Sequence, residues 1–79
     1  MARLLFICSF AIDDPTRASF PFIDANGAKE AGHEPRIHLR GDGVLLLKDI
    51  IAKNTVPPGW PPIQELLATS ISHNIPITV

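Results

Sequence analysis

Residues Leu4–Cys8 read Leu-Leu-Phe-Ile-Cys, and this unbroken apolar run decides the class of fold. A half-exposed strand alternates apolar and polar residues, whereas a strand buried on both faces of a parallel sheet does not. We therefore predict a buried parallel strand at Leu4–Cys8. Two further strands are predicted at Arg36–Leu39, with Pro35 held to the first position, and at Ile75–Val79.

The segment after the first strand carries the signals of a helix start and a helix end. Asp13 and Asp14 can cap a helix, and Pro15 suits its first position. Pro21 predicts a kink or a late helix start, and Gly32 fits the C-terminal cap. The face toward the sheet is predicted from helical spacing, with a glycine allowing close approach: Phe20, Ile23, Gly27 and Ala31.

Two more helices are predicted between the second and third strands. Gly41–Gly43 forms a turn in which Asp42 caps the next helix, and Asn54 ends that helix. Four prolines within residues 56–62 exclude regular structure there. The apolar spacing of the two helices predicts these core-facing residues: Leu47, Ile50 and Ile51 in the first, and Ile63, Leu66, Leu67, Ser70 and Ile71 in the second.

The order strand, helix, strand, helix, helix, strand predicts an α/β fold. Strands that alternate with helices pair in parallel through right-handed crossovers, so we expect a three-layer α/β/α arrangement around a parallel sheet. The 79 residues form a single domain, residues 1–79. The free energy gained by burying a core of this size is close to the entropic cost of ordering the chain. We therefore expect a homo-oligomer, or a fold that needs further residues.

The composition excludes several classes of protein. The chain is 46% hydrophobic and 19% charged, which is too apolar for intrinsic disorder. A net charge of −1 argues against nucleic-acid binding, which needs clustered Lys and Arg. No apolar run reaches the roughly 18 residues of a membrane helix, so no membrane contact is expected. One cysteine cannot form an internal disulfide, which favours a cytoplasmic location.

Candidate binding residues follow the first two strands, because ligands of open α/β sheets bind outside the carboxyl ends of the strands. The set comprises Cys8, Ser9, Asp13, Gly41, Asp42 and Gly43. Each also has a structural interpretation: a small buried hydrophobe for the cysteine, a cap for Asp13, and a plain turn for the glycines. The three histidines lack metal-ligand spacing, so no metal and no cofactor are predicted.

The order of these motifs along the whole chain resembles the DsrE/DsrF-like family of small sulfur-relay proteins. The matching features are the strand Leu4–Cys8, the helix entry Asp13–Ala18, Pro21-Phe22 with Ala25-Asn26, the segment Gly41–Val44, Pro58–Pro62 leading into Glu65–Leu67, and the strand Ile75–Val79.

The resemblance implies a three-layer fold with about five strands, assembled as a homotrimer or homohexamer. It also implies persulfide transfer through a cysteine in the loop after the strand that matches Ile75–Val79. That loop lies beyond the sequence, so we expect a domain that is incomplete at its C-terminus. Cys8 does not occupy the position of the family cysteine, and the persulfide role is not carried over to it.

Two functions remain open at this point. In the first, the chain belongs to a sulfur-relay protein that exchanges sulfur with a sulfur-carrier protein, by thiolate attack on a persulfide. In the second, it is a non-catalytic assembly or small-ligand-binding module of the same fold. No catalytic set is formed by these residues themselves, so at most a sulfurtransferase-type carrier is expected. A flavin- or nucleotide-binding domain is disfavoured because no phosphate-binding loop is present.

Overall fold

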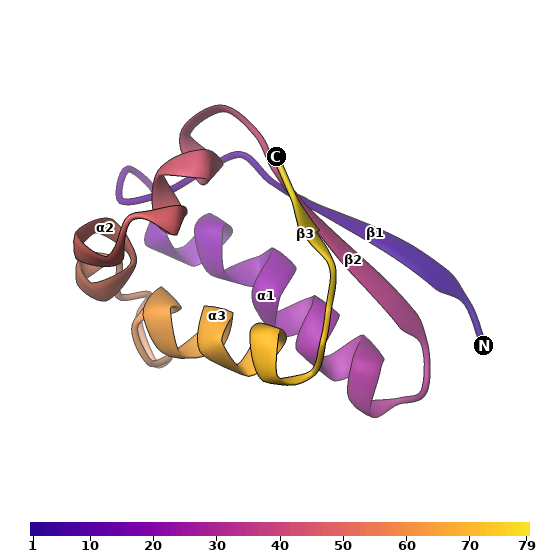
Figure 1. Cartoon of the computed structure of the whole chain (residues 1–79). Coiled ribbons are helices and arrows are strands. Elements are labelled where there is room, and N and C mark those ends of the chain that lie inside the picture. The colour runs from indigo at the N-terminus through magenta and orange to yellow at the C-terminus, as the bar shows by residue number, and fades with distance from the viewer.

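The computed structural model describes all residues, 1–79, and confirms a small α/β fold (Figure 1). Three parallel strands lie in the order β1-β2-β3 and alternate with helices. The elements are β1 (Arg3–Cys8), α1 (Pro15–Glu30), β2 (Glu34–Leu39), the 3₁₀ helix η1 (Gly41–Leu47), α2 (Asp49–Asn54), α3 (Ile63–Ser72) and β3 (Ile77–Thr78). None of the helices is long and apolar enough to cross a bilayer.

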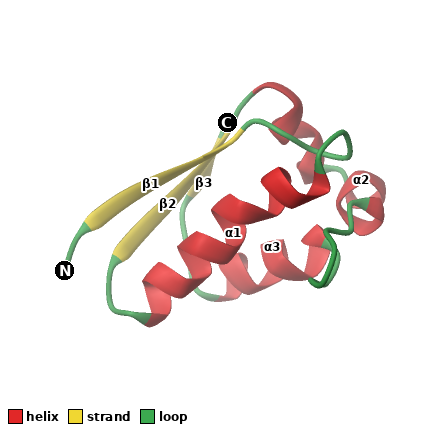
Figure 2. Cartoon of the chain, turned by 180° about the vertical axis from the view of Figure 1, so that it is seen from behind, coloured by secondary structure: helices red, strands yellow, loops and turns green.

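All helices lie on one face of the sheet, as Figures 1 and 2 show from opposite sides. The reason is the strand order. Two crossovers of the same hand that both step in the same direction along a sheet place their helices on the same face. A second helical layer requires the strand order to reverse direction, as it does in doubly wound folds. The chain therefore forms two layers, and the third layer expected from the sequence is not formed by these residues.

The outer face of the sheet is consequently open to solvent. Leu5 is 60% exposed and Ile7 is 48% exposed, although both lie in the apolar run of β1. The prediction that this strand is buried on both faces is therefore wrong. Only the alternate residues of the strand point toward the helices, and Cys8 among them is 1% exposed. His38 of β2 also lies on the outer face, where its Nδ1 is 2.9 Å from the hydroxyl of Thr78.

Helix α1 begins and ends as the sequence predicts, but it turns a different face to the core. The carboxylate of Asp14 accepts a hydrogen bond from the Arg17 amide (3.1 Å), and Pro15 takes the first helical position. The helix continues through Pro21, so it does not start late. Its core-facing residues are Ala18, Phe22 and Ala25, whereas Phe20 is half exposed. Of the predicted face, Ile23 packs against the core, but Gly27 and Ala31 are exposed like Phe20, so most of that prediction is wrong.

The helix predicted after the Gly41–Gly43 turn is divided into two short pieces. The first piece is η1, and α2 starts only at Asp49, so Asp42 caps no α-helix and makes no capping hydrogen bond. Leu47 and Ile50, both predicted to face the core, are exposed. Gly43, in the first turn of η1, packs directly against the backbone of Cys8 in β1. The predicted end of α2 at Asn54 is confirmed.

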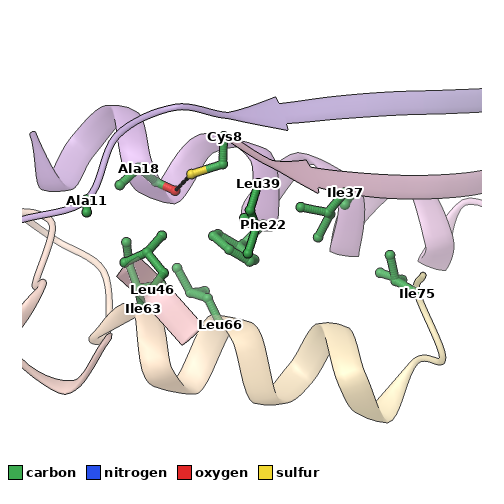
Figure 3. Close-up of a cluster of buried hydrophobic side chains, with 11 residues drawn as sticks. Cys8, Ala11, Ala18, Phe22, Ile37, Leu39, Leu46, Ile63, Leu66 and Ile75 are labelled. Carbon is green, nitrogen blue, oxygen red and sulfur yellow. Dashed lines mark hydrogen bonds between the residues drawn. The ribbon is translucent and has the colours of Figure 1, made fainter. Parts of the chain in front are cut away.

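Eleven buried residues between the sheet and the helices form the core (Figure 3). Phe22 lies at its centre, between Leu39 of the sheet and Leu66 of α3. The backbone amide of Ile63 donates to the carbonyl of Thr55 (3.0 Å) across the proline-rich loop. This bond fixes the start of α3 against the end of α2. The predicted stripe of α3 is buried at Ile63, Leu66 and Ser70, whereas Leu67 is partly buried and Ile71 is exposed.

Candidate functional site

The carboxyl ends of β1 and β2 lie side by side. This arrangement brings together four of the six candidate residues: Cys8, Ser9, Gly41 and Gly43. Cys8 is the register partner of Leu39, so the loops that follow the two strands meet. A Cβ on Gly43 would overlap the backbone carbonyl of Cys8, and one on Gly41 would lie 3.9 Å from the carbonyl oxygen of Ser9. Gly41 also has a φ of +55°, which favours glycine. Gly43 therefore allows backbone to pack directly on backbone, whereas Gly41 is favoured by its positive φ.

The thiol of Cys8 points into the core and is held by backbone carbonyls. Its Sγ lies 3.3 Å from the carbonyl oxygen of Phe10 and 3.6 Å from that of Ala18, and these two acceptors share its single proton; the contact with Ala18 is drawn in Figure 3. Burial raises the pKa of Cys8, and the nearby carboxylate of Asp13 adds to the effect, while the hydrogen bond to Phe10 opposes it. A thiol with this environment stays protonated near neutral pH, which is the opposite of an activated nucleophile.

The two candidate aspartates serve local structure or face solvent. Asp13 accepts a hydrogen bond from the Ala11 amide (2.9 Å), which closes the turn before α1. Asp42 is exposed in the first turn of η1. No group of three or more His, Cys, Asp or Glu side chains is arranged to hold a metal ion.

The larger of the two main hollows, about 680 Å³, lies at the amino ends of the strands. Its lining includes Arg3, Lys29 and Arg36, together with Glu34. Arg3 and Glu34 already form an ion pair (3.2 Å). None of the six candidate residues lines this hollow, because it lies at the opposite end of the sheet.

The second hollow, about 370 Å³, lies between the free edge of β1 and helix α1. Ser9 is the only candidate residue in its lining. Three aromatic side chains line it as well: Phe6, Phe10 and Phe20. The guanidinium of Arg17 lies over the Phe10 ring, 5.5 Å from its centroid. We name this hollow and the adjoining strand edge the β1 edge groove.

The β1 edge groove was not predicted from the sequence, because helical spacing placed Phe20 on the face toward the sheet. A signal was nevertheless present. Arg17, Phe20 and Asp24 follow one another at spacings of three and four residues, which places them on one face of a helix. An aromatic residue flanked by opposite charges on one helical face is unusual for a core stripe. This pattern of charged and aromatic residues favours a surface that contacts another molecule.

No protein-family model, no curated protein and no solved structure matches this chain.

Proposed function

We propose that these residues act as a homo-oligomeric assembly module. The observation that carries the proposal is the free edge of the sheet, at which the outer strand β1 exposes apolar residues. One face bears the helices, while the other presents Leu5 and Ile7 to solvent in the middle of an edge strand. Strand edges and apolar sheet faces are surfaces that proteins usually cover, because they bind other chains.

The size of the core supports the same proposal. Only 20 of the 79 residues are buried, so little apolar area is removed from water within one copy. Domains of this size gain much of their stability from disulfides, from bound metal ions or from association with other chains. The chain has one free cysteine and no disulfide. Association with further copies would supply the missing burial, and a net charge of −1 makes repulsion between copies small.

Sulfur relay remains an expectation that rests on the resemblance to DsrE/DsrF-like proteins. In that function the module would exchange persulfide sulfur with a sulfur-carrier protein in the cytoplasm. Cys8 gives this function no support, because it is buried and its pKa is raised. A sulfur-relay role therefore requires a thiol other than this one.

Sedimentation velocity over a hundredfold range of protein concentration tests the assembly function. We expect a weight-average mass that rises with concentration to a multiple of the 8.6 kDa chain mass. The double variant Leu5→Lys, Ile7→Lys should remain monomeric, since it places charges on the uncovered face. The control is Ile50→Lys, because Ile50 is 69% exposed but lies on α2, away from the sheet. A folded wild-type monomer at every concentration would contradict the proposal.

A further inference from the structure

We infer that the β1 edge groove is the site at which a second copy of this chain docks, with the two β1 strands antiparallel about a two-fold axis. This inference rests on the proposed assembly function and names its geometry. The axis passes close to Phe6 and Phe20 in each copy. The resulting sheet has six strands, with both helical layers on one side of it.

The backbone of β1 offers unpaired hydrogen-bonding groups at its outer edge. The carbonyls of Ala2 and Cys8 accept bonds from the amides of Glu34 and Arg40, so even-numbered residues of β1 direct their backbone groups toward β2. Backbone groups alternate in direction along a strand. The N–H and C=O groups of Leu5 and its odd-numbered neighbours therefore point away from the sheet, where β1 has no partner strand.

An antiparallel register centred on Phe6 makes this edge complementary to itself. Leu5 then lies opposite Ile7 of the second copy, and the two residues exchange both backbone hydrogen bonds. Their side chains form cross-strand apolar pairs on the uncovered face. Leu4 lies opposite Cys8 of the second copy on the helical side, and Arg3 lies opposite Ser9. No charged residue of β1 is placed against an apolar one.

Helix α1 carries a matching pattern of charge beneath the strand edge. Phe20 lies on its outward face and is 50% exposed, in the lining of the β1 edge groove. Arg17 and Asp24 line the same groove, three residues before Phe20 and four residues after it. Asp24 forms no ion pair within the chain. A two-fold axis near Phe20 brings Arg17 of each copy opposite Asp24 of the other, on both sides of a central Phe20 pair.

The area that a specific interface must bury is a small fraction of the surface of this chain. A specific interface needs about 1,000 Å² in total, or about 500 Å² from each copy. That is roughly a tenth of the 4715 Å² accessible surface of the chain. The groove runs along β1 from Phe6 and along α1 from Arg17 to Asp24, and the two α1 helices would pack at the ordinary distance of about 8–10 Å.

Charge reversal tests the two-fold arrangement. We expect Arg17→Asp alone and Asp24→Arg alone to weaken self-association at least tenfold, because each variant places like charges opposite one another twice. An equimolar mixture of the two variants should associate again, because the heterodimer restores both attractive pairs. The double variant should also associate. If mixing does not restore association, the proposed α1 contact is wrong.

A proline substitution tests the strand pairing. Leu5→Pro removes an N–H that points to the free edge and leaves the bonds to β2 in place. Its matched control is Leu5→Thr, which loses the apolar side chain and keeps the N–H. We expect Leu5→Pro to abolish association and Leu5→Thr to weaken it less. Equal losses would show that the uncovered face, and not the edge, makes the contact.

Amide exchange separates failure of this inference from failure of the assembly function. In the wild-type protein, exchange of the Leu5 and Ile7 amides should slow as concentration rises, whereas the Phe6 amide, which faces β2, should change little. Association without this alternation, or association unaffected by all of these variants, would contradict docking at the β1 edge groove. The assembly function itself would still be supported. A monomer at every concentration would instead remove the assembly function itself.

Discussion

Gly43 is the residue at which this fold tolerates a side chain least. A Cβ there would overlap the backbone carbonyl of Cys8, which cannot move without disturbing β1. We expect Gly43→Ala to lower the free energy of unfolding by about 1–3 kcal/mol. The control is Gly27→Ala, because nothing lies within 4 Å of a Cβ at Gly27, and alanine should stabilise α1 by about 0.5–1 kcal/mol. Urea titration measures both, and effects of the same sign would contradict the packing described.

Cys8 makes stability depend on pH in the alkaline range. Burial raises the pKa of the thiol in the folded protein, so the unfolded chain loses this proton first as pH rises. The contribution of the thiol to stability is therefore complete below about pH 8.5 and is lost as pH approaches the raised pKa. We expect the free energy of unfolding to fall above that pH, and to fall less steeply in Cys8→Ala. Parallel slopes for the two proteins would show that the thiol is not desolvated.

The contact between helices α1 and α3 includes one buried polar bridge. The Ser70 hydroxyl donates to the Asn26 Oδ1 (2.7 Å), and the Asn26 Nδ2 donates to the Leu66 carbonyl (3.3 Å). All buried polar side-chain atoms have partners. Ser70→Ala removes the donor to the Asn26 Oδ1 and should cost about 1–3 kcal/mol. A double-mutant cycle with Asn26→Ala should show coupling of at least about 0.5 kcal/mol, and additive losses would mean that the bridge contributes nothing.

The ends of α1 were predictable because local chemistry decides them. Asp14 and Pro15 fix the start of α1 whatever the rest of the molecule does. Its buried face was not predictable from spacing, because apolar residues occur on two sides of the helix. The side with Phe22 is buried, since Ala18 and Ala25 on either side of it are small enough for close approach to the sheet. That choice depends on tertiary packing, which periodicity does not contain.

The candidate site was predictable only as a location. Parallel strands had to bring the segments after Cys8 and Leu39 together, and the structure does so. The role that each of those residues has in the structure depends on contacts with residues distant in sequence, such as the contact of Gly43 with β1. The β1 edge groove was missed for a related reason. Whether an edge is free depends on strand order, and apolar runs carry no information about which strand lies at the end of a sheet.

At the scale of the whole molecule, the strand order explains both uncovered surfaces. Stepping from β1 to β2 to β3 in one direction leaves β1 at an edge and leaves one face without helices. The buried core is then limited to a single layer between sheet and helices (Figure 3). Association through the edge does not cover the open face. It doubles the sheet and places the exposed Leu5 and Ile7 of two copies in one continuous apolar patch.

Coupling between association and folding gives the last prediction. A partner that binds only the folded state raises the unfolding temperature in proportion to the logarithm of its concentration, so a self-associating chain unfolds at a higher temperature when it is more concentrated. We expect the midpoint of the wild-type protein to rise by several degrees over a hundredfold increase in concentration. The midpoint of Leu5→Pro should be independent of concentration and close to that of the dilute wild-type protein, because the ladder between β1 and β2 is retained. Circular dichroism in cells of different path length measures this directly. If the midpoint of the wild-type protein does not change with concentration, self-association does not stabilise the folded chain.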